Sequence, residues 1–150
     1  MIEAIDFMTI LPIWQQELWP GRESTIEPLS AIDVDSGYNM KLMEAEPFFW
    51  GAFSNSRQLI GVVSGFQTSD THFRSRGLWV AKDQRNQGLG KQLIQAVEKQ
   101  AVRRQCHILW TMPRQSSWEF YRRVGFQVLK EISQFEFGPH YIATKKLKLP

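Results

Sequence analysis

The sequence predicts an α+β fold in which a mixed, mostly antiparallel sheet carries helices on both faces. Three observations lead to this fold class. The chain is helical in pattern up to Trp19, strand patterns begin at Pro47, and a long amphipathic helix over residues 88–103 separates the later strands. With 150 residues, of which 43% are hydrophobic and 22% charged, the chain is expected to form a single domain over residues 1–150.

The N-terminal part is predicted to be mainly helical. Asp6 can cap a helix that runs to about Trp19, because apolar residues follow it at helical spacing. Pro12 can kink this helix, since proline lacks a backbone N–H. A second short helix is predicted over residues 24–31, and a loop over residues 33–37.

The rest of the chain alternates predicted strands with two predicted helices. Runs of β-branched and aromatic residues between turn residues indicate strands, and a 3.6-residue apolar spacing indicates helices. The predicted strands span residues 48–53, 59–66, 73–81, 107–111, 126–135 and 141–149. The predicted helices span residues 88–103 and 116–124, and Gly125 ends the second.

Composition excludes several classes of function. The single cysteine, Cys106, cannot form an internal disulfide, and the three histidines are scattered, so we expect no metal site and a reducing, cytoplasmic location. No segment has the pattern of a signal peptide or of a membrane span. Because the net charge is only +3 and basic residues alternate with acidic ones, we expect neither a nucleic-acid nor a membrane partner.

The clearest candidate site is the glycine loop VAKDQRNQGLG at residues 80–90, between a predicted strand and the long helix. Unsatisfied N–H groups at a helix N-terminus attract anions, glycine allows close approach, and Arg85 adds positive charge. The pair Gly88-x-Gly90 matches neither the Walker loop nor the three-glycine dinucleotide fingerprint. The loop therefore indicates a pyrophosphate site, the alternative being a tight turn whose glycines serve packing.

Two motifs together resemble those of the GNAT N-acetyltransferase superfamily. RNQGLG at residues 85–90 is similar to its pyrophosphate-binding signature, and FYRRVGF at residues 120–126 resembles its second hallmark. The order of elements matches over about the whole chain, and the residue-level resemblance covers about 76–126. The resemblance implies one acetyltransferase domain, a GNAT-like sheet with a splayed central strand pair, and acetyl-CoA as cofactor.

The resemblance also implies where acetyl-CoA binds. Loop amides would hold the pyrophosphate, and the central strand would pair with the pantetheine arm in the gap beside strand 107–111. The residues placed at the cofactor in this way are Leu78, Trp79, Val80, Arg85, Asn86, Gln87, Gly88, Leu89 and Gly90. Arg114 and Ser117 stand where many members carry Asn and Ala, and Arg114 can meet a CoA phosphate or be solvated at the helix start.

Two catalytic roles follow from the same resemblance. An amide near Val80 would stabilise the thioester oxyanion, and Tyr121 would protonate the departing thiolate. The alternative for Tyr121 is an ordinary core tyrosine. The amine would attack the thioester directly in a ternary complex.

Basic residues on the central strand are candidates for binding the acceptor. Arg74 stands where histone-acetylating members have a glutamate, and strand alternation places Arg74 and Arg76 on one face with Leu78 unless a bulge reverses it. Together with Arg22, they can bind a carboxylate or phosphate of the substrate, the alternative being a solvated strand end.

Other side chains are candidates for a general base or for a wall of the acceptor pocket. Trp110 and Trp79, on the two strands that should splay, are the candidates for the wall. His140 is expected in a turn after Pro139. The candidate bases are Glu44, Glu46, Asp70 and His72.

Three functions remain open at this point. The first is acetyl transfer to the amine of a small molecule, and the second is acetylation of protein N-termini or lysines. The third is a non-catalytic acyl-CoA sensor, against which Tyr121 argues. Pairing of the last strand, over residues 141–149, makes a homodimer possible.

Overall fold

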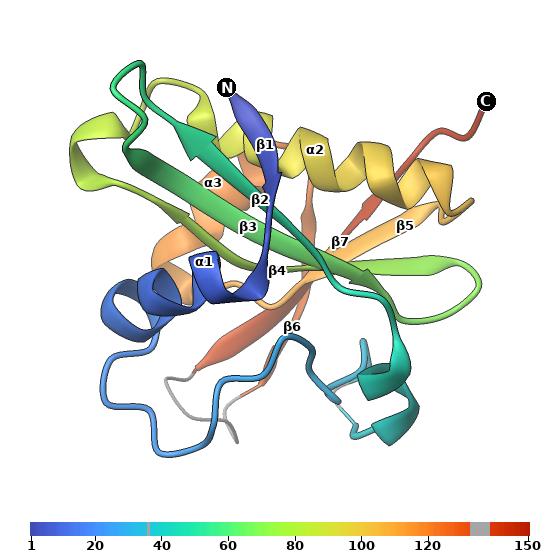
Figure 1. The fold of residues 1–150 in the computed structure, drawn as a ribbon. Helices are drawn as coiled ribbons and strands as arrows, with labels where there is room; N and C mark the ends of the chain where they lie inside the picture. The colour runs from blue at the N-terminus through green and yellow to red at the C-terminus, as the bar shows by residue number, and fades with distance from the viewer. Residues whose placement is uncertain (36, 133–138) are drawn as a thin grey trace.

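The structure is a computed structural model that describes residues 1–35, 37–132 and 139–150. Its strands form one sheet in the order β1-β2-β3-β4-β5-β7-β6 (Figure 1). The strands are β1 (Ile2–Ile5), β2 (Phe48–Phe53), β3 (Leu59–Gln67), β4 (His72–Val80), β5 (Ile108–Thr111), β6 (Gln127–Ile132) and β7 (His140–Lys146). The helices are α1 (Phe7–Ile13), α2 (Leu89–Arg103) and α3 (Trp118–Arg123). Short turns of other helix types are η1 (Trp14–Leu18), η2 (Met40–Glu44), η3 (Lys82–Gln84) and η4 (Gln115–Ser117).

The predicted fold class is confirmed. Every neighbouring strand pair is antiparallel except β4 and β5, which run parallel. Val62 and Val63 show the two covered faces, because successive side chains of a strand point to opposite sides. Val62 packs with residues of α1, and Val63 packs with residues of α2. None of the described helices has the length and apolar character needed to cross a bilayer.

Some predicted elements need correction. The helix predicted over residues 24–31 is wrong, because this stretch is irregular. Pro28 within it lacks an N–H and disfavours helical backbone at the residue before it. The strand predicted over residues 126–135 begins at Gln127 and reaches Ile132, and residues 133–135 lie outside the described part.

Other differences concern element ends and short elements. The last strand ends at Lys146, before the predicted boundary. The described residues of the loop predicted over 33–37 are irregular or turn, and Ser36 lies outside the described part. The sequence patterns missed β1 and η2, which are too short to show a period.

The first helix follows the predicted start and changes type after Pro12. The Asp6 carboxylate accepts hydrogen bonds from the Thr9 backbone N–H at 2.8 Å and the Thr9 hydroxyl at 2.7 Å, so it caps α1. Two residues after Pro12 the helix widens into the π-helical turn η1, where the Trp19 N–H bonds the Trp14 carbonyl at 2.8 Å. This turn brings the Trp14 side chain, which is fully buried, against β4.

A β-bulge in β4 changes which face its side chains occupy. Val62 pairs with Trp79 and Ser64 pairs with Arg76, so two residues of β4 oppose one residue of β3. Gly77 in this bulge has a φ of +73°, which glycine adopts readily. Leu78 therefore packs on the α2 side: the strand has the bulge that the sequence left open, and this bulge separates Leu78 from the face of Arg74 and Arg76.

The central strand pair is splayed as predicted. β4 pairs with β5 only from His72↔Ile108 to Arg74↔Trp110. Beyond Arg74, β4 pairs with β3 alone among the described residues. The two strands separate at this point and leave a gap in the middle of the sheet.

Candidate active site

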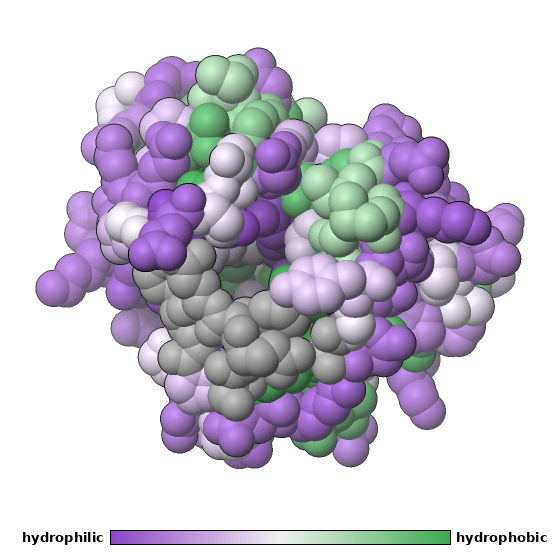
Figure 2. All heavy atoms as spheres, turned by 90° about the horizontal axis from the view of Figure 1, so that it is seen from below, coloured by the Kyte–Doolittle hydropathy of each residue, from purple (hydrophilic) through white to green (hydrophobic). Residues whose placement is uncertain are grey.

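A cleft of about 1410 Å³ opens where β4 and β5 separate. It is bordered by the end of β4, the glycine loop, the end of β5, α3 and the segment between η1 and η2. The underside of the molecule is hollowed near its centre, with both hydrophilic and hydrophobic residues around the hollow (Figure 2). Most of the predicted site residues line this cleft: Arg74, Arg76, Leu78, Trp79, Val80, Arg85, Asn86, Gly88, Leu89, Gly90, Arg114, Ser117 and Tyr121.

The two glycines of the loop serve different purposes. Gly88 caps α2 with a φ of +82°, and a Cβ there would meet nothing within 4 Å, so conformation alone favours glycine. A Cβ at Gly90 would lie 3.0 Å from the Phe120 ring and 3.8 Å from Val80. Gly90 therefore lets α2 approach α3 closely. The packing alternative therefore applies to Gly90, while Gly88 leaves open space at the start of α2.

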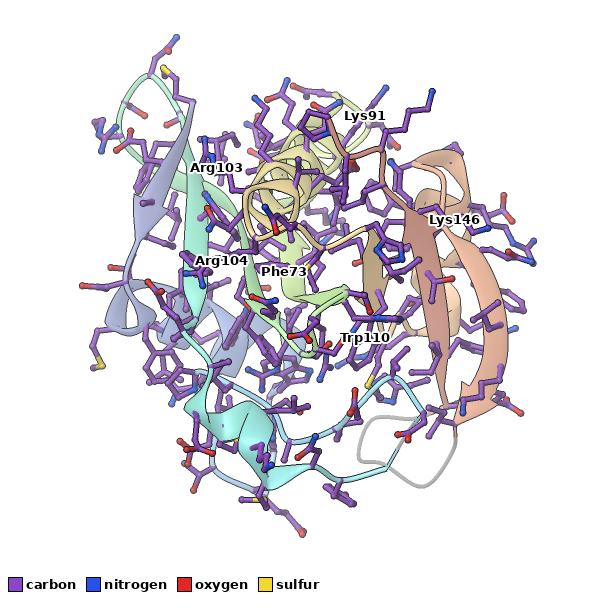
Figure 3. The ribbon with its side chains drawn as sticks, turned by 90° about the vertical axis from the view of Figure 1, so that its right-hand side faces the viewer. Phe73, Lys91, Arg103, Arg104, Trp110 and Lys146 are labelled. Carbon is purple, nitrogen blue, oxygen red and sulfur yellow. The ribbon has the colours of Figure 1, made fainter. Side chains whose placement is uncertain are left out.

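The N-terminus of α2 is suited to an anion. No side chain caps it and its first turn contains no acidic residue, so its first N–H groups have no side-chain acceptor. Lys91 lies in this first turn, lines the cleft and extends outward (Figure 3). A cation at this end of a helix opposes the helix dipole, and an anionic ligand would remove that conflict. Lys91 was not among the site residues predicted from the sequence, although its position in the first turn could have revealed it.

The backbone of Val80 points into the gap. The next residue, Ala81, donates its N–H to Ile60 of β3 at 2.8 Å, and successive residues of a strand alternate in direction. The N–H and C=O of Val80 therefore point away from β3. The Nε of Arg85 donates to this Val80 carbonyl at 2.9 Å, which fixes Arg85 beside the gap.

Tyr121 lies in the wall of the cleft on α3. It is buried, its ring packs edge-on against Phe120 and Phe126, and its hydroxyl bonds to the side chain of Thr111. Burial raises the pKa of Tyr121 to about 12, although the bond to Thr111 acts the other way. The phenol is therefore protonated at neutral pH and can donate a hydrogen bond or a proton into the cleft.

Arg74 and Arg76 are buried in the other wall of the cleft. Arg76 donates to the Glu27 carbonyl at 2.8 Å, and Arg74 contacts the Met112 sulfur at 3.4 Å. Burial lowers the pKa of Arg74 to about 10 and that of Arg76 well below its usual value. The alternative of a solvated strand end is excluded for both, since each is only 6% exposed.

Arg114, which follows β5, and His140, which begins β7, both line the cleft. Arg114 donates to the Leu18 carbonyl at 2.5 Å and forms a β-bridge with His140, so it is not solvated at the helix start. His140 begins β7 and lines the cleft, so its predicted place in a turn is wrong. Burial, and then the charges of Arg114 and Arg74, lower the pKa of His140. Sequence spacing gave no signal for this contact, because β7 lies far along the chain.

Several predicted residues lie outside the lining of the cleft. Glu44 and Glu46 are exposed, and Glu46 forms an ion pair with Arg104 at 2.6 Å. They precede β2, which begins away from the splayed end of β4. Trp110 of β5 is fully buried (Figure 3), and its indole N–H donates to the Thr68 hydroxyl at 3.0 Å. These three residues therefore do not line the cleft.

The loop residue Gln87 and the other two candidate bases also lie elsewhere. The side chain of Gln87 turns back to the Asp83 carbonyl at 3.5 Å. Asp70 and His72 lie near the start of β4, at the end opposite the splay. Among the residues that the structure describes, no group of His, Cys, Asp or Glu side chains could hold a metal ion.

Comparisons with known proteins agree with this geometry. Residues 11–126 match the model of the acetyltransferase (GNAT) family. An aminoglycoside 6'-N-acetyltransferase complexed with coenzyme A is 15% identical over 100% of this chain and 99% of that one, with a TM-score of 0.72. A GNAT-family acetyltransferase from Staphylococcus aureus Mu50 is 16% identical over 99% of this chain and 100% of that one, with a TM-score of 0.64.

A third structure shares the fold over a shorter length. The PaiA N-acetyltransferase from Thermoplasma acidophilum, in complex with coenzyme A, is 20% identical over 71% of this chain and 65% of that one, with a TM-score of 0.58. No curated protein matches the sequence. At these identities the structural likenesses concern the fold alone.

Proposed function

Because the chain belongs to the GNAT acetyltransferase family, we propose that it transfers the acetyl group of acetyl-CoA to the amine of a small molecule. The observation that carries this proposal is the gap beside β4, where the Val80 backbone and the Tyr121 hydroxyl border one cleft. Acyl transfer from a thioester needs a backbone N–H that can bond the carbonyl oxygen and a protonated group that can donate to the leaving sulfur.

The residues present fit acetyl-CoA, which the family uses. A glycine cradle with open space at Gly88, an uncapped helix N-terminus and Lys91 suit a pyrophosphate. The unpaired edge of β4 suits an extended amide-bearing arm, since its backbone groups have lost their neighbouring strand. When bound, acetyl-CoA supplies an acetyl group activated as a thioester.

Each step then has a residue of this chain to support it. The Val80 N–H would donate to the carbonyl oxygen of the thioester, where negative charge develops. His140, neutral at pH 7 because its pKa is lowered, accepts the proton of the attacking amine directly or through water. Tyr121 would donate its hydroxyl hydrogen to the sulfur as the carbon–sulfur bond breaks, a solvent proton would restore the phenol, and His140 would release its proton to solvent.

Coenzyme A release by the purified protein, with acetyl-CoA and a panel of small amines, tests the proposal. We expect turnover with at least one amine, and a drop in kcat of about 100-fold in Tyr121→Phe, the scale of general acid catalysis. Tyr141→Phe is the matched control, because Tyr141 is equally buried but outside the cleft lining.

Two results would contradict the proposal. If acetyl-CoA binds but no amine supports turnover, the chain is not a small-amine acetyltransferase, and the non-catalytic sensor becomes the better interpretation. If Tyr121→Phe and Tyr141→Phe slow turnover equally, Tyr121 is a core residue and not the acid.

A further inference from the structure

We propose that the acceptor is an anionic amine, whose carboxylate or phosphate binds Arg74 and Arg76 in the cleft. This inference rests on the proposed acetyltransferase function and adds the chemical class of its substrate. It starts from two buried cations in the wall of a cleft that must admit a second substrate.

The first supporting observation is the lack of an acidic partner. Among the described residues, neither Arg74 nor Arg76 forms an ion pair, and the Nε and Nη1 atoms of Arg74 are buried without any hydrogen-bond partner. Glu27 acts on Arg76 through its charge, but its side chain is exposed and its carbonyl is the group that Arg76 bonds. Buried charges in proteins are normally paired, and an anionic ligand would supply the partner that the described residues do not.

The guanidinium of Arg74 keeps its positive charge despite its burial. A guanidinium with a pKa of about 10, as in Arg74, still carries its proton at neutral pH. The charges of Arg74 and Arg22 also act on Arg76, so both lie close to it. Three neighbouring cations at the edge of a cleft attract an anion.

Aromatic rings lie next to the guanidinium groups of both Arg74 and Arg76. The Arg76 guanidinium carbon lies 4.9 Å from the Trp14 ring and 5.1 Å from the Trp19 ring. That of Arg74 lies 5.0 Å from the Trp110 ring. Rings near a guanidinium hold it in place through cation–π attraction, and the Nε and Nη1 donors of Arg74 have no protein partner among the described residues.

The position of the pair on β4 sets the size of the acceptor. Arg76 and Val80 pair with Ser64 and Gly61, which are three residues apart on β3, so the bulge shortens the interval along β4 to roughly 10 Å at about 3.3 Å per residue, before the reach of the side chain is subtracted. A small molecule can span this interval with its anion on the arginines and its amine near the Val80 N–H. Amino acids and phosphorylated amines have this form.

Pairs of amines that differ only in the anion test the proposal. Suitable pairs are γ-aminobutyrate with butylamine, for a carboxylate, and phosphoethanolamine with ethanolamine, for a phosphate. For wild type we expect kcat/KM to favour the anionic member of at least one pair by 30-fold or more, mainly through KM. The pair that shows the preference identifies which anion is bound.

Substitutions of Arg74 and Arg76 test whether these two residues cause the preference for the anionic amine. We expect Arg74→Gln and Arg76→Gln each to reduce the anionic-to-neutral ratio at least 10-fold, and Arg76→Lys to retain part of it. Arg103→Gln, an exposed arginine at the end of α2 and outside the cleft, should leave the ratio unchanged. A ratio near one in wild type, or a ratio that survives both Gln variants, would overturn the inference while leaving the proposed activity in place.

A binding measurement keeps the test independent of turnover. With saturating CoA to occupy the glycine loop, γ-aminobutyrate and phosphoethanolamine are compared for the rise in Tm they cause. A rise in wild type that disappears in Arg76→Gln supports the anion site even if no amine is acetylated, in which case only the proposed function fails. Equal rises in wild type and Arg76→Gln contradict the site.

The stability of Arg74→Gln separates a ligand site from a structural role. If Arg74 serves a ligand, removing its unpaired charge should leave Tm unchanged or raise it, since functional sites often cost stability. If Arg74 mainly supports the core, the variant should melt lower than Arg103→Gln, and the inference fails.

Discussion

Gly77 shows how closely one residue can be constrained. Its φ of +73° belongs to the left-handed region, and its carbonyl accepts the Trp14 indole N–H at 2.9 Å. A Cβ built at this position would lie 2.4 Å from the Trp14 ring, far inside van der Waals contact. Trp14 therefore holds the bulge in β4, and the bulge turns Arg76 and Leu78 to opposite faces.

Gly77→Ala should destabilise the protein by about 2 to 5 kcal/mol, the sum of a left-handed alanine and an overpacked core. Gly21→Ala is the control, because Gly21 has a φ of +71° with nothing within 4 Å of its Cβ position. It should cost only about 1 kcal/mol, the backbone part alone. Urea unfolding measures both, and equal losses would show that Trp14 does not hold Gly77.

His140 predicts a pH dependence. Its pKa lies below the ordinary 6.5, first through burial and then through Arg114 and Arg74, so the unfolded chain binds this proton at higher pH than the folded chain does. The free energy of unfolding should therefore be insensitive to His140 above pH 6.5 and fall as the pH drops below it. His72 should add to this fall, because burial and His107 lower its pKa despite the opposing charge of Asp33.

Urea unfolding between pH 7.5 and pH 5 checks the prediction. His140→Gln should reduce the loss of stability on acidification, His72→Gln should remove a separate share, and the two effects should add. If both variants lose as much stability as wild type, the titrating groups lie elsewhere. If His140 is the base, wild-type kcat should also fall below pH 6.5.

At the scale of an element, Lys91 predicts opposite effects on stability and binding. Lys91→Gln removes a cation from the N-terminal turn of α2, which should stabilise the free protein by about 0.3 to 1 kcal/mol through the helix dipole. The same change should weaken acetyl-CoA binding several-fold, because the anion loses a nearby charge.

Thermal unfolding and calorimetric titration with acetyl-CoA measure the two effects. Lys99→Gln is the control, since Lys99 is exposed on the same helix away from its first turn. It should change neither quantity appreciably. Weaker stability with unchanged affinity in Lys91→Gln would remove this residue from the cofactor site.

The elements themselves were largely predictable from local patterns. α2 shows a long amphipathic period, and β3 is rich in β-branched residues, so both were predicted near their true ends. The helix predicted over residues 24–31 failed because its apolar spacing was short and Pro28 opposed it. β1 escaped notice because four residues are too few to show alternation.

For the whole molecule, the gap in the sheet predicts a response to the cofactor. Acetyl-CoA at 100 times its Kd should add about 2.7 kcal/mol to the free energy of unfolding. For a chain of this length that corresponds to a rise in Tm of about 5 to 10 °C. Differential scanning fluorimetry measures the shift, and a concentration-independent Tm would contradict cofactor binding.

Hydrogen exchange tests where the cofactor binds. The Val80 amide points into the gap, so it should exchange rapidly in the free protein and slowly with acetyl-CoA bound. The Ala81 amide already bonds to Ile60 and serves as the internal control. Equal exchange of Val80 with and without acetyl-CoA would show that the ligand does not use this edge.

The site was predictable where it lies within one stretch of sequence and not where the fold assembles it. The glycine loop and Tyr121 could be found because their motifs are local. The contacts of Arg114 with Leu18 and with His140 join residues far apart in the chain, and no spacing encodes them. The burial of Trp110 likewise depends on packing from β6 and β7.

The close approach of Gly90 to Phe120 ties two parts of the enzyme together. Gly90 lies in the first turn of the helix proposed to hold the donor, and Phe120 precedes Tyr121, the proposed acid. A larger residue at position 90 would push α3, and Tyr121 with it. Evolutionary change in donor affinity is thus coupled to leaving-group chemistry here, whereas Arg74 and Arg76 lie before the bulge, away from this contact.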